Sequence, residues 1–305
     1  MKKIFGLFIV MVPLIFSGCN DPEETDCIYA DKRFCDPNFN GGDIGRGIVE
    51  FSGNTANYTS KVLLEDFTGF RCTNCLPAIN TAKNLKAVNP DRLSIVGVHC
   101  TSFFAAPLTD DPNEPYHNDF RTPEGEFYVD HYGLQSLPTG VINRQGDGVS
   151  ETINFSLWPD RVNSLLAANN PEVFIQINDI KFNEDTTRAS VNLIAKPLQS
   201  SSKSYLINVA LTEDGIMEAQ KDNDTPGGEI LDFVHDHVLR YSGYGPFGIP
   251  AFTGDIELEQ NQALAFELEV ELSEEWVLQN CELLVYVSNE QGFDVVQVEE
   301  THLIE

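Results

Sequence analysis

The sequence predicts an α/β part followed by an all-β part, with the change near residue 171. Up to residue 170, apolar strand-like runs alternate with runs of helical periodicity, which is typical of a sheet covered by helices. After Pro171 the runs are short and rich in β-formers, and no amphipathic helix separates them. Residues 264–272 alternate apolar side chains with glutamates. This pattern predicts one buried and one solvated face, and hence an immunoglobulin-like β-sandwich over residues 171–305.

The first eighteen residues have the pattern of an export signal. Lys2 and Lys3 precede an apolar run over residues 4–16, and Ser17-Gly18 supply a small-residue cleavage site. The run is too short to predict a membrane-spanning helix. Residues 16–19 resemble the lipobox of bacterial lipoproteins, which implies that Cys19 becomes a lipid-modified N-terminus whose acyl chains anchor the protein. The alternative is a soluble secreted protein with an ordinary cleavage site.

Charge restricts the class of partner. The full chain has a formal net charge of −28, and removal of residues 1–18 with their two lysines gives −30 over 287 residues. That length is enough for two ordinary domains, and 42% hydrophobic residues is typical of a globular protein. Such an acidic chain is repelled by phosphate groups, so nucleic acid and anionic lipid head groups are not expected partners.

Residues 19–57 are expected to form an acidic tether and a lead-in to the first domain. Four acidic residues lie between positions 21 and 26, and a stretch rich in Asn and Gly follows at 38–42. Cys27 and Cys35 lie close together there, and an oxidising compartment favours a small disulfide between them. The acidic cluster also resembles signals that direct some Gram-negative lipoproteins to the cell surface, so the periplasmic and the cell-surface face both stay open.

Residues 58–170 are predicted to alternate strand and helix. Asn89-Pro90 ends the first helix, Thr122-Pro123 begins the second, and Gly133 ends it. Residues 101–121 are expected to form a long, Pro-rich and acidic loop that holds Phe103, Phe104 and Tyr116. We expect strands at 61–67, 93–98 and 139–144 and helices at 72–88, 122–133 and 157–168. Strands in the second part are expected near 173–175, 189–193, 205–211, 263–272 and 283–287.

The segment with the most chemical information is a Cys-x-x-Cys pair, Cys72 and Cys75, between a strand and a helix. A helix N-terminus stabilises negative charge, and the thiolate is the reactive form of cysteine. We therefore expect Cys72 to be an exposed nucleophile, with Arg71 favouring its thiolate, and Cys75 to be the resolving thiol of a reversible disulfide. The alternatives are a static disulfide or half of a zinc site.

This part of the chain resembles a thioredoxin-fold protein. Asp66-Phe67, followed by four residues and Cys72, has the thioredoxin spacing, and Leu137-Pro138-Thr139 resembles the cis-proline loop of that fold. The resemblance implies that Pro138 is cis beside Cys72 and that Asp66 is a buried carboxylate that assists proton removal from Cys75. Arg71 stands in place of the usual Trp, and Thr73-Asn74 in place of Gly-Pro. In the alternative interpretation, Asp66 or Glu65 simply points to solvent.

A more specific resemblance is to the outer membrane protein 28 family of Gram-negative lipoproteins. It rests on residues 63–69 running into 72–75, and downstream on residues 119–122, 137–140, 143–144 and 235–240. The resemblance covers roughly residues 61–240. It implies an outer-membrane lipoprotein with a thioredoxin-like domain at 58–170 and a β-rich C-terminal domain.

Other candidate ligands give weaker predictions. His235 and His237 would point to the same face of a strand and could bind one metal, and His99 and Cys100 could complete a zinc site with the cysteine pair. Two ligands fall short of a closed site, so neither a metal nor a cofactor is expected. Cys100 and Cys281 either pair between domains or remain buried thiols, and we favour unpaired thiols.

Two functions of different classes follow from these patterns. The first is thiol–disulfide exchange on exported proteins, with protein thiols or disulfides as partners. The second is a non-catalytic envelope binding or adhesion protein that uses the thioredoxin-like domain as a scaffold, with the aromatic loop 101–121 as a lid or binding surface. A metal carrier is a third, less favoured reading.

Overall fold

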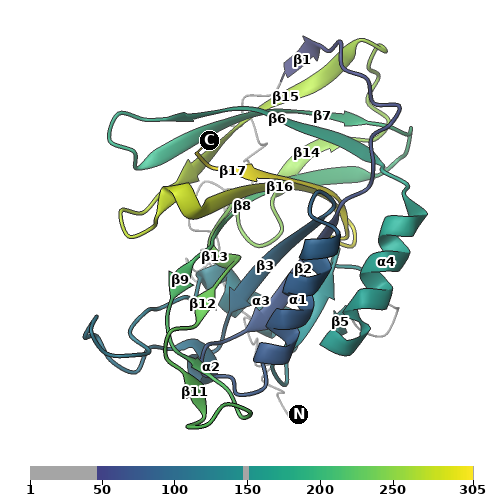
Figure 1. The fold of residues 1–305 in the computed structure, drawn as a ribbon. Coiled ribbons are helices and arrows are strands. Elements are labelled where there is room, and N and C mark those ends of the chain that lie inside the picture. The colour runs from purple at the N-terminus through teal and green to yellow at the C-terminus, as the bar shows by residue number, and fades with distance from the viewer. Residues whose placement is uncertain (1–46, 147–150, 305) are drawn as a thin grey trace, which may run out of the picture.

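The computed structural model describes residues 47–146 and 151–304 (Figure 1). The predicted signal peptide, the lipidation of Cys19, the Cys27–Cys35 disulfide and most of the tether lie outside these residues. Among the described residues, no helix combines the length and the apolar character needed to cross a bilayer.

The observed elements follow the predicted alternation up to residue 170. The helices are α1 (Leu76–Val88), α2 (Ser102–Ala105), α3 (Pro123–His131) and α4 (Trp158–Ala168). The strands of this part are β1 (Gly47–Glu50), β2 (Val62–Thr68), β3 (Leu93–His99), β4 (Thr139–Ile142) and β5 (Thr152–Ile153). The later strands are β6 (Val173–Phe182), β7 (Arg188–Pro197), β8 (Ser204–Glu213), β9 (Ile216–Met217), β10 (Gln220–Lys221), β11 (Glu229–Ile230), β12 (Val234–His235), β13 (Val238–Gly243), β14 (Ile249–Thr253), β15 (Gln262–Glu271), β16 (Cys281–Asn289) and β17 (Val295–His302).

A large mixed sheet runs through the molecule. Its strands follow the order β17-β16-β8-β13-β3-β2-β4-β5, and β14 pairs with β8. β2 pairs in parallel with β3 and antiparallel with β4, while β13 joins β3 to β8. Strands from both sides of residue 171 therefore share one sheet, and a division into two separate domains at that position stays a prediction.

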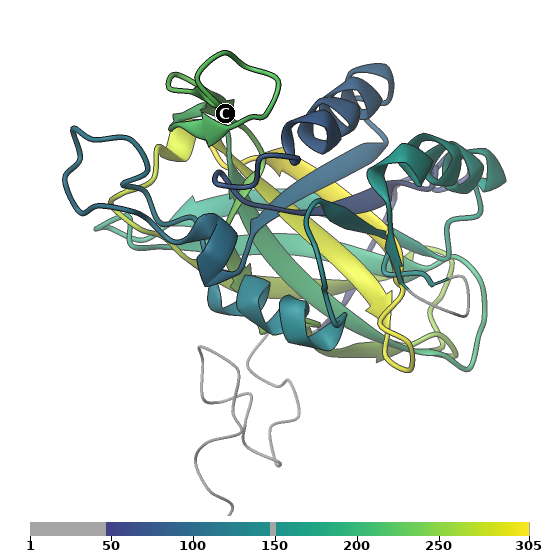
Figure 2. The ribbon, with the colours of Figure 1, turned by 90° about the horizontal axis from the view of Figure 1, so that it is seen from below.

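Helices cover both faces of the β3-β2-β4 region (Figure 2). α1 and α4 pack on one face, where Ala82 and Val162 meet Leu64 in one apolar cluster. α3 packs on the opposite face, where Tyr128 joins Leu63. Since side chains alternate along a strand, Asp66 lies on the α1 face and Glu65 on the α3 face.

The second part of the chain is β-rich, as predicted. A four-stranded sheet in the order β1-β15-β7-β6 lies over the β17-β16-β8 region of the large sheet (Figure 1). The core between the sheets combines residues such as Val191 and Leu268 from the smaller sheet with Val209 and Val285 from the larger one. The fold class is thus mixed α/β plus a β-rich layer.

Two elements differ from their predicted bounds, and the local backbone explains each difference. The helix predicted from residue 72 begins at Leu76, because residues 72–75 form a turn in which the Cys75 N–H donates to the Cys72 carbonyl. The strand predicted over 139–144 ends at Ile142, because Asn143 and Arg144 have φ of 49° and 51°. The predicted start of α3 is confirmed: the Thr122 side chain accepts a hydrogen bond from the Gly125 N–H.

Candidate functional site

The cysteine pair lies between the end of β2 and the start of α1. Cys72 and Cys75 are joined by a disulfide, and their Cα atoms are 5.4 Å apart. The Cys72 N–H donates to the Gly69 carbonyl, and Cys75 is the N-cap residue of α1. The sequence therefore places the sulfurs at the helix N-terminus, where a thiolate is stabilised.

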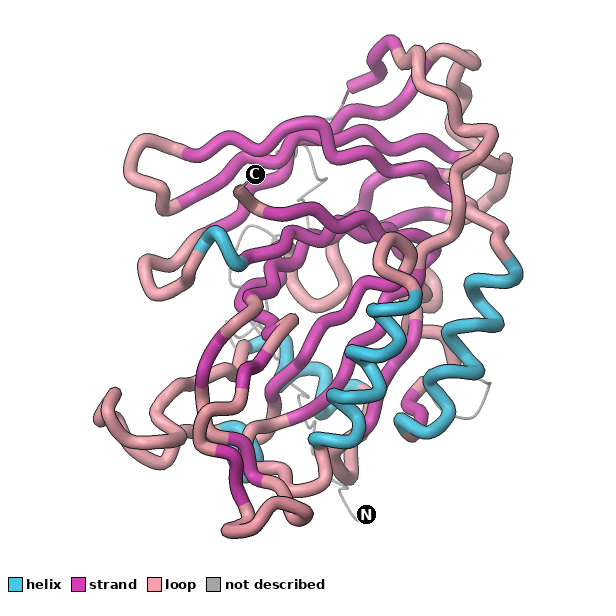
Figure 3. Tube along the Cα trace, in the orientation of Figure 1, coloured by secondary structure: helices cyan, strands magenta, loops and turns pink. Residues whose placement is uncertain are grey.

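Both cysteines are buried, and the expectation of an exposed Cys72 is wrong. Cys72 is 1% exposed and Cys75 0% exposed. The cysteines pack in one apolar cluster with Phe67, Val98 and Leu137. A hairpin over residues 215–236, here named the covering hairpin, lies against the same turn and is built from the antiparallel pairs β9·β12 and β10·β11. Figure 3 shows its short strands near the start of α1. The prediction failed because residues distant in sequence enclose the pair, among them Leu137 in the same cluster and Gln220, which is 148 positions from Cys72.

The covering hairpin is held on the cysteine turn by polar contacts. The Lys221 N–H donates to the Phe70 carbonyl at 2.7 Å, and the Gln220 side chain donates to the Cys72 carbonyl at 3.1 Å. The Asn223 side chain donates to the Asn74 side chain at 3.1 Å. These contacts reach the backbone directly around the disulfide. The covering hairpin therefore lies directly against the cysteine turn.

A second segment, residues 101–106, lies on the other side of the turn. The Arg71 N–H donates to the Phe104 carbonyl, and the Arg71 guanidinium donates to the Ala106 carbonyl at 3.0 Å. A side chain at Gly69 would place its Cβ 2.6 Å from the Phe104 carbonyl oxygen, so only glycine permits this approach. Arg71 thus fixes the loop. Phe103, by contrast, is 73% exposed.

The covering hairpin and the long loop are also tied to each other. Glu218 in the hairpin accepts hydrogen bonds from the backbone N–H groups of Tyr116, His117 and Asn118. Burial alone would raise the pKa of Glu218, but the backbone N–H groups of Asn118, Ala219 and Tyr116 hold it below its ordinary value. Tyr116 further donates to Glu229 at 2.8 Å. The two segments form one continuous cover.

The proline loop predicted from the resemblance lies in the same region. The Leu137–Pro138 peptide bond is cis. Leu137 belongs to the apolar cluster that contains Cys72, Cys75 and Phe67. The loop and the cysteine pair are therefore parts of one packed group on the α3 face of the sheet.

Asp66 is buried on the opposite face of the sheet. It is 3% exposed, and its Oδ1 has no hydrogen-bond partner among the described residues. Burial raises the pKa of Asp66 to about 8. The alternative that Asp66 or Glu65 points to solvent is wrong, since Glu65 is also 3% exposed. A carboxyl group that stays protonated near neutral pH can hold or donate a proton.

Asp66 lines a cavity of about 20 Å³ beneath α1, which has room for one water molecule. Thr68 and His99 line it together with His235 from the covering hairpin. The rings of His99 and His235 are 5.3 Å apart, and burial lowers the pKa of both, to about 4 for His235. Both imidazoles are therefore neutral at pH 7. His99 Nδ1 and His235 Nε2 have no hydrogen-bond partner among the described residues.

The two histidines of the triplet 235–237 do not act as a strand pair. β12 ends at His235 and β13 begins at Val238, because His237 has a φ of 59°. His235 packs against Phe233 and Phe120, whereas His237 contacts Asp214. The expectation that both imidazoles share one strand face is wrong.

The remaining cysteines agree with the expectation of unpaired thiols. Cys100 and Cys281 are both buried and are not bonded to each other. Burial raises the pKa of both thiols to about 12, so neither is a reactive thiolate at neutral pH.

Comparison with known proteins gives a family and a fold. The family model described as outer membrane protein Omp28 matches residues 126–305. This range includes the downstream segments 137–140, 143–144 and 235–240 and begins after the cysteine pair. No curated protein matches the chain.

Solved structures with a similar fold include HBP35 of Porphyromonas gingivalis, with 12% identity, a TM-score of 0.58, and coverage of 81% of this chain and 76% of that chain. Protein AGR_C_4864 from Agrobacterium tumefaciens has 12% identity, a TM-score of 0.45, and coverage of 82% and 97%. A domain of the outer membrane lipoprotein Omp28 from Porphyromonas gingivalis has 18% identity, a TM-score of 0.27, and coverage of 44% and 88%.

Proposed function

The chain belongs to the Omp28 family and is an envelope protein of the outer membrane; from this premise we propose that it is a lipoprotein that exchanges disulfides with exported protein thiols. Cys72 and Cys75 would carry the exchange, and Cys19 would carry the lipid. One observation carries the proposal. A Cys-x-x-Cys disulfide at a helix N-terminus, a cis-proline loop and a protonated Asp66 gather around the same end of β2.

The surrounding architecture supports a thioredoxin-like arrangement of residues 58–170. β2 is parallel to β3 and antiparallel to β4, and α1 and α4 cover one face while α3 covers the other. The four-stranded sheet packed on the β17-β16-β8 region supports an immunoglobulin-like sandwich for the remainder. These two fold names are part of the proposal.

The reaction balances without a further reagent. A substrate thiolate attacks Cys72 Sγ, which breaks the Cys72–Cys75 bond and releases Cys75 as a thiolate. A proton from solvent neutralises the leaving sulfur, because Asp66 lies on the opposite face of the sheet and neither cysteine lines its cavity. A second substrate thiolate then attacks the substrate sulfur of the mixed disulfide and releases Cys72. Two electrons pass from two substrate thiols to the cysteine pair, and the substrate leaves with a disulfide.

The cover sets a condition on this chemistry. Since both sulfurs are buried, exchange with a protein requires that neighbouring segments move, and we propose that the covering hairpin is the segment that opens. The experiment is turnover of reduced, unfolded protein substrate by the purified chain, with oxidised glutathione as the oxidant that re-forms the Cys72–Cys75 bond. The reduction potential of the pair is measured in glutathione buffers. Cys72→Ser should abolish turnover, and Cys281→Ser is the matched control because Cys281 is buried but unbonded. Equal turnover by Cys72→Ser and wild-type protein would reject the proposal.

The burial of both sulfurs also favours a second candidate, a binding scaffold with a static disulfide. Apolar side chains are exposed on the two covering segments, among them Phe103 on the loop and Leu231 on the hairpin, 61% exposed. Phe104 is partly buried against the core, so Phe103 is the better probe of the surface. Capture of an envelope partner that is lost in Phe103→Ser but kept in Cys72→Ser/Cys75→Ser would favour the scaffold.

A further inference from the structure

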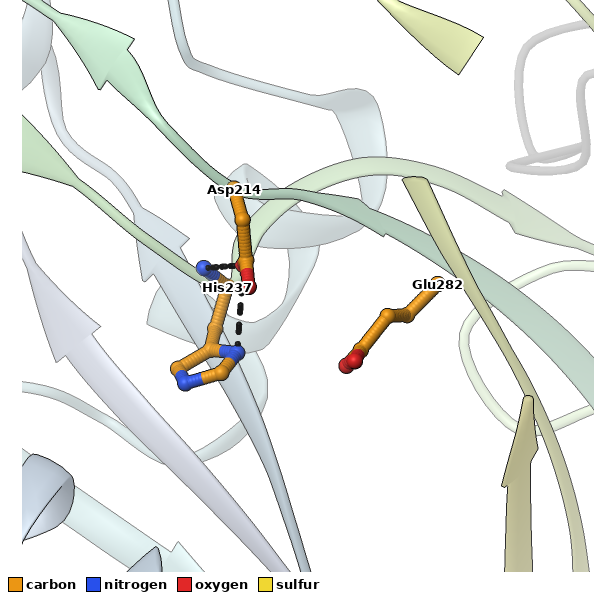
Figure 4. A group of neighbouring side chains, drawn as sticks. All are labelled: Asp214, His237 and Glu282. Atoms are coloured by element: carbon orange, nitrogen blue, oxygen red, sulfur yellow. Dashed lines mark hydrogen bonds and ion pairs between the residues drawn. The ribbon is translucent and has the colours of Figure 1, made fainter. Parts of the chain in front are cut away.

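Three side chains that could bind a metal meet at the base of the covering hairpin. Asp214, His237 and Glu282 each offer one ligand atom, and these atoms lie within 4.8 Å of one another (Figure 4). Asp214 directly follows β8, His237 lies between β12 and β13, and Glu282 belongs to β16. Figure 4 shows the Glu282 carboxylate pointing toward the His237 ring. The group therefore joins three segments that are distant in sequence.

The backbone around the group is held firmly. The His237 N–H donates to Asp214 Oδ1 at 2.6 Å, and the His237 carbonyl accepts from the Gly97 N–H at 2.7 Å. The Asp214 N–H donates to the Asn280 carbonyl. These bonds hold His237 at a φ of 59°, a conformation that costs energy for a residue other than glycine. Ligands fixed in this way need little rearrangement to bind a cation.

The side chains of the group are incompletely satisfied. His237 Nδ1 lies 3.2 Å from Asp214 Oδ1, yet it is buried and has no aligned hydrogen-bond partner among the described residues. Glu282 and Asp214 bring two carboxylates together in a half-buried place. Lys86, a cation near Glu282, is already paired with Glu300. A divalent ion would offset the repulsion between the two carboxylates and could bind both His237 Nδ1 and Asp214 Oδ1.

We propose that Asp214, His237 and Glu282 bind a zinc-class divalent metal ion. The imidazole favours zinc over magnesium or calcium, which prefer oxygen ligands alone. Metal–ligand distances of about 2.0–2.2 Å in a tetrahedron set neighbouring ligand atoms roughly 3.3 Å apart. The 3.2 Å between His237 Nδ1 and Asp214 Oδ1 already meets this value. The exposed His302, 3.9 Å from Glu282, or a solvent molecule can occupy the fourth position.

Zinc binding to the oxidised chain tests this proposal. Isothermal titration with Zn²⁺ should show one site per chain, and X-ray absorption should show nitrogen and oxygen ligands without sulfur. Glu282→Gln and His237→Asn should each weaken binding at least about tenfold. Asn is chosen at 237 because it tolerates positive φ. His131→Gln, which removes an imidazole packed on Phe127 instead, is the matched control and should bind as wild type.

Further variants keep the result decisive. Cys72→Ser/Cys75→Ser should bind Zn²⁺ with unchanged affinity, because the proposed ligands contain no thiol. Circular dichroism of each variant without metal checks that it is folded, and Glu282→Gln, an isosteric change on an ordered strand, serves if His237→Asn does not fold. Absence of a zinc site, sulfur ligation, or unchanged affinity in a folded Glu282→Gln protein would overturn the assignment.

Discussion

Arg144 forms a two-point ion pair with Glu65 inside the molecule. Its Nε and Nη2 donate to the two Glu65 carboxylate oxygens at 2.9 and 2.7 Å, and both side chains are almost fully buried. Arg144 also donates to the Pro246 carbonyl and to the hydroxyls of Tyr128 and Tyr286. Because Tyr286 belongs to β16, this network links the helical part of the molecule to the β-rich part.

We expect loss of either partner of this pair to destabilise the whole fold. Arg144→Met leaves the Glu65 charge buried without a partner, which costs about 3–5 kcal/mol of unfolding free energy. Urea denaturation followed by circular dichroism measures this loss. Asp179→Asn, which breaks the exposed Asp179–Lys181 pair, should leave the denaturation midpoint unchanged. A wild-type midpoint for Arg144→Met would show that the pair does not stabilise the fold.

Some parts of this network could be predicted from the sequence, and others could not. Strand β2 and helix α3 could be predicted because their signals are local: apolar spacing in β2, and Thr122, Pro123 and Gly133 at the ends of α3. The pairing of Glu65 with a residue 79 positions away has no local signal. Burial of both depends on strands that join only in the folded sheet.

The candidate site also contains some features that the sequence predicts and others that it does not. The cysteine pair and the proline loop were readable from short motifs, whereas the covering hairpin was missed. Pro226-Gly227-Gly228 is a turn signal that could have suggested a hairpin. Its short flanking strands are too brief to show a period, and their contact with Cys72 is wholly non-local. The left-handed conformation of His237 likewise follows from its contacts with Asp214 and Gly97.

Asp66 should make stability depend on pH. Its pKa is about 8 in the folded chain and about 3.9 when unfolded, so only the folded chain keeps the proton between these values. The unfolding free energy therefore falls as pH rises from about 4 to 8, by at most about 1.4 kcal/mol per pH unit from this group. This loss of stability is absent at pH values below the pKa of Asp66 in the unfolded chain. It is complete at pH values above the pKa of Asp66 in the folded chain.

Asp66→Asn removes this dependence. Urea denaturation of both proteins at pH 5 and pH 8 should show the variant gaining stability relative to wild type by up to about 4 kcal/mol across that range. The other ionisable groups near Asp66 are present in both proteins. To first order, their titration cancels when the unfolding free energies of variant and wild type are subtracted. These groups are Lys83, His99, Cys100, His235, Asp236 and His237. A difference that does not change with pH would contradict a protonated Asp66.

Weakening the cover should expose the disulfide to reductants. Gln220→Ala removes the hydrogen bond to the Cys72 carbonyl, and Asn223→Ala removes that to Asn74. If each bond contributes about 1 kcal/mol, the double variant should be reduced by dithiothreitol at least about tenfold faster. Gln199→Ala, which removes an exposed bond to Asn170, is the control. An unchanged rate would mean that opening of the hairpin does not limit access.

Gly140 should be required for the packing of Trp158. A Cβ at this position would lie 2.5 Å from the ring of Trp158, the first residue of α4, which is fully buried against the sheet. Gly140→Ala should therefore displace the ring, cost about 1–3 kcal/mol and alter the tryptophan fluorescence. Gly47→Ala, where a Cβ meets nothing within 4 Å, is the matched control. Wild-type fluorescence and stability would show that the ring can move freely aside.

Zinc should slow reduction of the disulfide, because Asp214 and His237 flank the covering hairpin on either side. A metal ion bound to both and to Glu282 would fasten the base of the hairpin to β16, so that opening would strain or break a metal contact. We expect the oxidised chain to react more slowly with a phosphine reductant when Zn²⁺ is present than when it is absent. Glu282→Gln should lose most of this slowing, while His131→Gln should keep it. If Zn²⁺ slows Glu282→Gln and wild type equally, the metal acts on the reductant or on released thiols and not through the hairpin.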